Sequence, residues 1–274
     1  MSSPCGRRND RLRSRLLDVE GDKTKRILIP AVMGPTLPRP GNDSAPLVIG
    51  AVIRLARTRM VWPMDAGLLP VKRLDRAKAR LAGSFGPDER AQLALALFED
   101  ALGLCSATSW LRWLVVSDDD DVLARATSHG LATLRDQGTG LNDALSMAIA
   151  TLTARGARSV TVVPSDIPLA YEEDLRDLLD TGATSDVVVV PSEGDGGTNA
   201  LYLSPPALLE PRFGPASLKA HVDAAAERQL RCSILALPRL ALDIDTIEDV
   251  DAFLDRPAYG SSRTRALLRT LRPR

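Results

Sequence analysis

Within residues 60–258, short uninterrupted apolar runs alternate with longer amphipathic stretches. The apolar runs are rich in β-branched residues and show no polar alternation, which is typical of strands buried on both faces. They predict strands at 66–71, 110–117, 131–134, 159–164, 186–191, 199–203 and 231–237. The amphipathic stretches predict helices at 86–104, 119–130, 140–155, 171–180, 216–228 and 246–254.

Strands that alternate with helices in this way predict an α/β fold, with a mostly parallel central sheet flanked by helices. In such sheets ligands bind at the carboxyl ends of the strands. The loops that follow the predicted strands are therefore where chemistry is expected.

The two ends of the chain differ from this middle part. Residues 1–59 are rich in Arg, Pro, Gly and Asp without sustained periodicity, and we expect a disordered or poorly ordered N-terminal extension. Residues 60–258 are expected to form the catalytic domain, and residues 259–274, with five arginines and no acid, a solvated basic C-terminal tail.

Charge and cysteine content narrow the class of protein. Residues 60–258 carry 18 basic and 30 acidic side chains, which argues against a nucleic-acid-binding domain. No apolar run is long enough to span a membrane, and the N-terminus lacks the apolar segment of a signal peptide. The three cysteines are far apart, as in a reduced cytoplasmic protein. We expect a cytoplasmic monomer or homodimer.

Three aspartates at predicted strand ends are the main chemical signal. Asp166 lies between Pro164 and Pro168 directly after a strand, and Asp243 and Asp245 are spaced so that both lie on one face of an extended segment. Carboxylates that converge repel one another unless a cation lies between them, and hard oxygen ligands select Mg²⁺ or Mn²⁺. The alternative is that Asp245 or Thr246 only caps the last predicted helix.

Other strand-end loops carry groups suited to anions. Lys72, Lys78 and Arg80 follow the first predicted strand and could lie along a triphosphate, or could be a solvated basic helix start. There is no GxxxxGK[ST], so the phosphate-binding loop of P-loop enzymes is excluded. The segments 194–199 and 213–217 offer backbone N–H groups and hydroxyls for an anion.

The segment 138–143 opens a helix with glycines and an Asn-Asp pair. Glycines let a flat ligand approach the backbone, and Asn142 or Asp143 could read the edge of a base. A glycine turn with a helix cap explains the same residues. His129 is interpreted as a surface residue at a helix end, and His221 as a packed or solvent-facing histidine. The sequence shows no pattern typical of a Ser/His/Asp triad.

Six ordered blocks together carry a specific resemblance: PVKRLDRAKARLA, DxGTGLNDAL, PSDIPL, GGTNAL, FGPASLKAH and LALDIDTIEDV. Over about residues 66–255 the chain resembles the phosphoenolpyruvate/2-phospho-L-lactate guanylyltransferases of coenzyme F-420 biosynthesis. The resemblance implies a nucleotide-diphospho-sugar transferase (GT-A-like) fold, GTP as donor and a small phosphorylated carboxylic acid as acceptor. Ala216 departs from the glycine common in relatives, which bears on acceptor choice.

The resemblance also implies roles for single residues. Lys72, Lys78 and Arg80 would contact the triphosphate, and Gly140 and Asn142 would lie near the guanine. Asp166, Asp243 and Asp245 would hold one or two Mg²⁺ ions, so that Asp166 and the three cationic residues are the catalytic set. The acceptor's carboxylate and phosphate would be bound by Thr198, Gly214 and Ser217.

Phosphoenolpyruvate is the favoured acceptor because the Arg-rich, Lys-poor composition suggests a bacterial protein, and the resemblance implies phosphoenolpyruvate for bacterial members of the family. The alternatives are 2-phospho-L-lactate or 3-phospho-D-glycerate as acceptor, a molybdopterin-dinucleotide-forming enzyme, a glycosyltransferase with a DxD in 117–121, and a non-catalytic nucleotide sensor. The LAGGxSxRMG start of the molybdopterin enzymes is absent.

Overall fold

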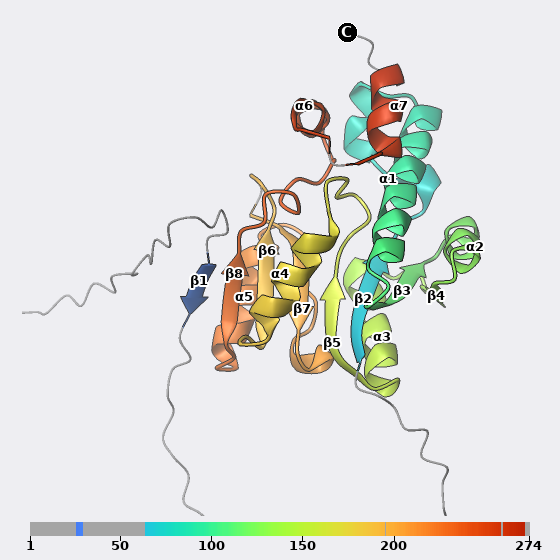
Figure 1. Cartoon of the computed structure of the whole chain (residues 1–274). Helices are drawn as coiled ribbons and strands as arrows, with labels where there is room; N and C mark the ends of the chain where they lie inside the picture. Colours follow the sequence, from blue (N-terminus) through green and yellow to red (C-terminus); the bar gives the residue numbers. More distant parts are fainter. Residues whose placement is uncertain (1–25, 30–63, 195, 259, 272–274) are drawn as a thin grey trace, which may run out of the picture.

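A computed structural model describes residues 26–29, 64–194, 196–258 and 260–271, which form one eight-stranded sheet with helices on both faces (Figure 1). The strands are β1 (Arg26–Ile29), β2 (Met64–Pro70), β3 (Arg112–Ser117), β4 (Ala132–Arg135), β5 (Ala157–Val162), β6 (Val187–Pro191), β7 (Thr198–Leu203) and β8 (Cys232–Leu235). The helices are α1 (Pro87–Ala107), α2 (Asp120–Ser128), α3 (Leu141–Ala154), α4 (Glu172–Gly182), α5 (Ser217–Glu227), α6 (Ile247–Asp255) and α7 (Arg263–Leu271).

The strand order is β1-β8-β6-β7-β5-β2-β3-β4. Strands β5, β2, β3 and β4 are adjacent in this order and run parallel to one another. Strand β6 is parallel to β8. Strand β7 lies antiparallel between β5 and β6. The predicted α/β class with a mostly parallel sheet is confirmed, and the carboxyl ends of β2, β3, β5 and β6 bring their following loops to the same edge.

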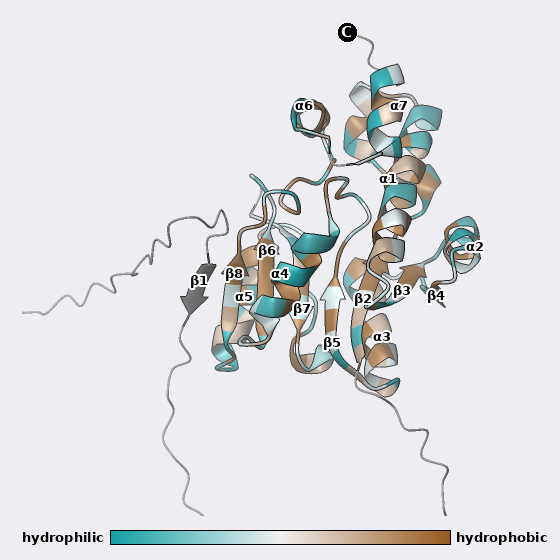
Figure 2. Cartoon of the chain, in the orientation of Figure 1, coloured by the Kyte–Doolittle hydropathy of each residue, from teal (hydrophilic) through white to brown (hydrophobic). Residues whose placement is uncertain are grey.

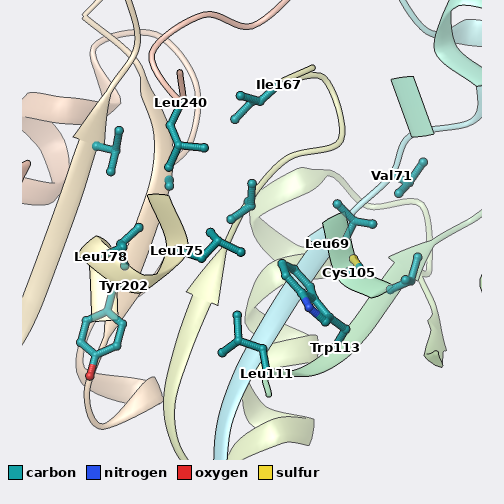
Figure 3. Close-up of a cluster of buried hydrophobic side chains, with 14 of the residues drawn as sticks. Leu69, Val71, Cys105, Leu111, Trp113, Ile167, Leu175, Leu178, Tyr202 and Leu240 are labelled. Atoms are coloured by element: carbon teal, nitrogen blue, oxygen red, sulfur yellow. The ribbon is translucent and has the colours of Figure 1, made fainter. Parts of the chain in front are cut away.

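Alternate residues of the strands face two separate cores, and Figure 2 shows the hydrophobic sheet between helices with hydrophilic outer faces. One core packs the sheet against α1, α2 and α4, and includes Leu69, Trp113, Leu175 and Tyr202 (Figure 3). The other packs the opposite face against α3 and α5. Burial on both faces explains why the strands appear in the sequence as unbroken apolar runs.

Gly67 shows how closely the first core is packed. A Cβ atom at this position of β2 would lie 2.4 Å from the indole of Trp113 on β3. Trp113 itself donates its indole N–H to the hydroxyl of Thr108, at 3.0 Å. We conclude that the side chain of Trp113 fills the space that glycine leaves in the neighbouring strand.

A third core lies beyond the carboxyl edge of the sheet and includes α7. The carboxylate of Asp100 on α1 accepts hydrogen bonds from the backbone N–H groups of Arg263 and Thr264, and Leu268 is fully buried. Arg265 donates to the carbonyl groups of Phe253 and Leu254, which satisfies the end of α6. The expectation of a solvated basic tail is therefore wrong for residues 263–271, because an apolar stripe lies between its arginines.

The expectation that residues 1–59 are disordered or poorly ordered also needs one change. Strand β1, within the stretch predicted to be disordered, pairs antiparallel with β8 at the edge of the sheet. The rest of residues 1–59 lies outside the described residues. Among the described residues, no helix has the length and apolar character needed to cross a membrane.

Candidate active site

A cavity of about 670 Å³ opens at the carboxyl edge of the sheet. Its walls come from the loops after β2, β3, β5 and β8, the β6–β7 connection, and the starts of α3 and α5. This volume is within the range of small-molecule sites. Most of the predicted site residues line it: Lys72, Lys78, Arg80, Gly140, Asp166, Thr198, Gly214, Ser217, Asp243 and Asp245.

The three predicted metal ligands converge in this cavity. One carboxylate oxygen from each of Asp166, Asp243 and Asp245 lies within 4.8 Å of the other two. A backbone hydrogen bond of 3.0 Å, from the Ile244 N–H to the Asp166 carbonyl, fixes the two loops together. Asp166 therefore meets Asp243 and Asp245 although it precedes them by 77 and 79 positions in the chain.

Thr246, rather than Asp245, caps α6. Its hydroxyl accepts from the Asp249 N–H, and the Asp249 carboxylate accepts from the N–H groups of Asp245 and Thr246. This reciprocal capping box satisfies the helix start without the Asp245 side chain. The carboxylate of Asp245 is left to face the cavity.

Two cationic side chains contact this cluster. The Nζ atom of Lys78 lies 2.9 Å from Oδ2 of Asp166 and 3.1 Å from Oδ1 of Asp245. Arg80 approaches the other oxygen of Asp245 at 3.4 Å and is largely exposed. The predicted triphosphate-binding residues thus reach the carboxylates from the loop after β2.

Charge and burial oppose each other in the pKa values of the cluster. Burial alone would raise the pKa of Asp166, but the charge of Lys78 and its hydrogen bond outweigh burial and lower that pKa. Burial likewise works against the charged form of Lys78, yet the two aspartates raise its pKa. Asp243 lacks a cationic partner in this set, so burial and the charges of Asp166 and Asp245 raise its pKa to about 6.

The cluster fits a hard divalent cation. Asp243 accepts a hydrogen bond of 3.1 Å from the amide of Asn199, which orients one of its oxygens and leaves the other. Three oxygen donors at this spacing, one of them with a pKa raised by burial and by its neighbours' charges, match the ligands that Mg²⁺ selects. The residues that could hold the ion are Asp166, Asp243 and Asp245.

The loop that carries Lys78 is held by a residue that sequence analysis did not assign to the site. Asp119 uses one carboxylate oxygen to cap α2, through the Asp121 N–H at 3.0 Å. Its other oxygen accepts from the Leu74 N–H at 3.2 Å. The acidic run after β3 contains the candidates for a glycosyltransferase DxD. Within this run, Asp119 instead connects the start of α2 to the loop after β2 through its two carboxylate oxygens.

Of the two residues expected near the guanine, Gly140 lines the cavity and Asn142 does not. Gly138 and Gly140 line it, with positive φ angles of 75° and 130° that favour glycine. Asn142 does not line it: its amide donates to the Phe213 carbonyl at 3.0 Å and accepts from the Phe213 N–H at 2.8 Å. The prediction that Asn142 contacts the guanine does not agree with this geometry, since both ends of the amide are bound to the backbone.

Two other carboxylates line the same part of the cavity. Asp118 follows β3 and Asp136 follows β4. Guanine presents N–H donors on its Watson–Crick edge, and carboxylates are acceptors. Sequence analysis named neither residue as a site candidate, although Asp136 begins one of the recognised blocks.

The predicted acceptor residues Thr198, Gly214 and Ser217 also line the cavity. The Ser217 hydroxyl is buried at the start of α5 and has no hydrogen-bond partner within the described part of the chain. Gly214 has a φ of 129°, and Ala216 has a φ of 55°, in the left-handed region. Glycine adopts such a left-handed backbone at no steric cost, which is consistent with the glycine that the resemblance implies before this serine.

The sheet order, the carboxylate cluster and the cationic loop define the class of protein as a nucleotidyltransferase. A family model described as guanylyl transferase CofC like matches residues 66–272. The chain belongs to this guanylyltransferase family. The match extends past the predicted domain end at residue 258 and includes α7.

Named relatives agree with the family. A phosphoenolpyruvate guanylyltransferase of Roseiflexus sp. is 38% identical over 196 residues, which is 72% of this chain and 87% of the relative. A 2-phospho-L-lactate guanylyltransferase of Methanothermobacter thermautotrophicus is 39% identical over 207 residues, or 75% and 90% of the two chains.

Solved structures agree with the fold. A protein described as a nucleotide-diphospho-sugar transferase, from Desulfovibrio desulfuricans G20, superposes with a TM-score of 0.65 at 21% identity and covers 76% of this chain and 95% of its own. A nucleotidyl transferase from Methanothermobacter gives 0.51 at 15% identity, over 76% and 99%. At these identities the likeness extends to the fold alone.

Proposed function

We propose that this protein transfers GMP from GTP to phosphoenolpyruvate with release of pyrophosphate, in coenzyme F-420 biosynthesis. The observation that carries the proposal is the arrangement within one cavity. Its lining includes three converging carboxylates, the basic side chains of Lys72, Lys78 and Arg80, and a Ser217 hydroxyl that has no hydrogen-bond partner within the described part of the chain. Such a cavity suits two anionic substrates that meet at a metal site.

The proposal includes dependence on Mg²⁺ held by Asp166, Asp243 and Asp245. A bound Mg²⁺ would neutralise charge between the acceptor phosphate and the triphosphate. Lys72, Lys78 and Arg80 would steady the leaving pyrophosphate. This role requires Lys78 to exchange the two aspartates for phosphate oxygens as its partners.

The reaction needs no general base from the protein. An oxygen of the acceptor phosphate attacks the α-phosphorus in line, the bond to the bridging oxygen breaks, and pyrophosphate leaves with that oxygen. The attacking phosphate is already ionised at neutral pH. Holding two anions together and offsetting their charge then provides the acceleration.

At the acceptor end, Thr198, Gly214 and Ser217 would bind the carboxylate and phosphate. The buried Ser217 hydroxyl supports this role, because a buried polar group without a partner costs free energy that a ligand can recover. At the nucleotide end, Gly140 would pass close to the base.

Phosphoenolpyruvate is proposed over 2-phospho-L-lactate because the Arg-rich, Lys-poor composition suggests a bacterial protein, and the Roseiflexus and Rubrobacter relatives are named phosphoenolpyruvate guanylyltransferases. Identity to the two named relatives is nearly equal, so overall similarity does not separate the acceptors. The glycosyltransferase and sensor alternatives are not favoured by relatives that are named guanylyltransferases. A cytoplasmic location and a monomeric or homodimeric state belong to the same proposal.

The test is pyrophosphate release by purified protein with GTP and Mg²⁺, with phosphoenolpyruvate, 2-phospho-L-lactate and 3-phospho-D-glycerate offered separately. We expect release with phosphoenolpyruvate and its loss when Mg²⁺ is chelated. Release with another acceptor only would replace the substrate and keep the reaction. Folded protein that binds GTP and reacts with none of the three would overturn the proposal.

A further inference from the structure

His221 is a buried residue of α5 that lies directly behind the acceptor end of the cavity. Its side chain is fully buried. Its Nδ1 atom lies 3.1 Å from the hydroxyl oxygen of Thr198, and its Nε2 atom lies 2.9 Å from the backbone N of Arg212. The ring also packs edge-on against Phe213. Both nitrogens thus contact segments that form the acceptor pocket.

These contacts fix the tautomer of the ring. A backbone N–H can only donate, so Nε2 must accept from Arg212 and cannot carry a proton. A neutral imidazole then carries its proton on Nδ1, which faces the Thr198 oxygen and also bonds the Ser217 backbone, so the Thr198 hydroxyl can accept from this nitrogen but cannot donate to it. Burial, together with the charge of Arg212, lowers the pKa of His221 to about 4, in agreement with a neutral ring.

The direction of the Thr198 hydrogen bond follows from this tautomer. Because the Thr198 hydroxyl cannot donate to Nδ1, its proton is available to another group. Thr198 lines the cavity together with Ser217, whose hydroxyl has no partner in the described part of the chain. Two hydroxyl donors are then available to one anionic ligand.

We infer that His221 is a positioning residue that turns the Thr198 hydroxyl into a hydrogen-bond donor for the acceptor's anionic group and fixes the 212–214 loop beside it. The inference rests on the proposed function for the identity of the acceptor. The loop is held on both sides, since His221 accepts from the Arg212 N–H while Asn142 binds both polar groups of the Phe213 backbone. His221 touches no substrate itself and acts through Thr198 and this loop.

The first test is the tautomer, measured by long-range ¹H–¹⁵N NMR on the full chain at pH 7. The chain has only two histidines, so the His129→Asn variant assigns the signals. We expect a neutral Nδ1–H ring for His221 and a change in its signals on addition of phosphoenolpyruvate. An Nε2–H ring, or a charged ring, would overturn the inference whether or not the protein is active.

The second test compares His221→Asn with His221→Gln in steady-state kinetics. The asparagine amide occupies the place of Nδ1 and still donates to Thr198, whereas the glutamine amide occupies the place of Nε2 and does not. We expect His221→Gln to raise the KM for phosphoenolpyruvate about tenfold, the effect of one lost hydrogen bond. His221→Asn should raise it less, and the KM for GTP should change less than twofold in both.

Thr198→Val separates positioning from simple packing. If His221 acts through Thr198, adding His221→Gln to Thr198→Val produces little further rise in the acceptor KM. Fully additive effects would contradict the inference and indicate a packing role. His129→Gln, on an exposed histidine, is the matched control and should leave both KM values unchanged. If the wild type makes no pyrophosphate with any acceptor, the proposed function fails, and the NMR result alone decides the inference.

Discussion

Lys78 places its ammonium nitrogen 2.9 Å from Asp166, and the same nitrogen lies 3.1 Å from Asp245. The ammonium group therefore occupies the neighbourhood in which a divalent cation would be stabilised by the same carboxylates. A cation and an ammonium group that share oxygen ligands compete for them. In the proposed reaction the phosphates of GTP would offer Lys78 an alternative partner, so we expect metal binding and GTP binding to favour each other.

Lys78→Met tests this competition. Without nucleotide, we expect the variant to bind Mn²⁺ more tightly than the wild type, because the repulsion among the carboxylates is no longer offset by the ammonium. Turnover should fall, since one positive charge on the triphosphate is lost. Isothermal titration measures the first effect and pyrophosphate release the second. Lys219→Met, on an exposed lysine of α5, is the control, and weaker Mn²⁺ binding by Lys78→Met would refute the competition.

Asp166→Asn should leave the fold intact and lower turnover by about 10²-fold or more, because a carboxylate that holds the metal and carries charge is replaced by a neutral amide. Pyrophosphate release measures the rate, and circular dichroism with thermal unfolding checks the fold. Asp186→Asn, which disturbs an ion pair with Arg231 at the far end of the sheet, is the matched control. Unchanged turnover in a folded variant would exclude Asp166 from the metal site.

Asn142→Ala separates the geometry described here from a direct role in base recognition. Its amide binds the Phe213 backbone, so we expect the variant to raise the KM for the acceptor more than the KM for GTP. A loss of roughly two hydrogen bonds corresponds to a rise of about tenfold or more. Asp143→Ala, on the exposed neighbour, should change neither value. A selective rise in the KM for GTP would instead support a direct contact between Asn142 and the guanine.

Leu268→Ala tests whether α7 is part of the domain. Leu268 is fully buried in the third core, so truncation should cost about 2–5 kcal/mol in the free energy of unfolding. Chemical denaturation measures this cost. Thr270→Ala, on the exposed face of the same helix, should be nearly neutral. If both variants are equally stable, residues 263–271 behave as the solvated tail that their charge suggested.

Asp65 predicts a dependence of stability on pH. Burial would raise its pKa, but hydrogen bonds from Arg158 and Ser159 and the charge of Arg158 lower it below the ordinary value of 3.8. A carboxylate whose folded pKa is depressed stabilises the fold above 3.8, and this stability is lost as the pH falls through the folded pKa.

Asp65→Asn should therefore lower the free energy of unfolding by roughly 1–2 kcal/mol at pH 7. The difference from the wild type should close as the pH falls below 3.8. Denaturation at several pH values measures it, with Asp223→Asn, in an exposed ion pair, as control. A difference that stays constant down to acid pH would show that the carboxylate's charge does not carry the effect.

The elements with strong periodicity could be predicted from the sequence with bounds close to those observed. The helix expected at 216–228 is Ser217–Glu227, and the strand expected at 186–191 is Val187–Pro191. The direction of β7 could not be predicted, because a run buried on both faces has the same pattern in either orientation. Helix α7 was missed because its arginines dominate a short amphipathic stretch.

The site was predictable in composition but only partly in geometry. Strand-end placement brings Asp166 and the Asp243–Asp245 pair together, and this convergence is confirmed. The partners of Asn142 and His221 were not predictable, since each binds a backbone group in a loop whose course the sequence pattern does not describe. A polar side chain before or within a helix looks the same whether it faces a ligand or holds a neighbouring loop.

The third core links the loop that carries Lys78 and Arg80 to the loop that carries Asp243 and Asp245. Leu81, just after Arg80, is buried together with Ile244, which lies between those two aspartates, and with Leu268. Lys78 and its partner Asp245 are 167 residues apart in the chain. During synthesis on the ribosome, strands β2 to β5 can pair as they emerge, and Leu81 can pack early against Phe85, Leu93 and Leu97, but the third core is complete only when residues 242–268 follow. The carboxylate cluster is therefore complete only after Asp245 has been made, so the cavity is one of the last parts of the domain to be finished.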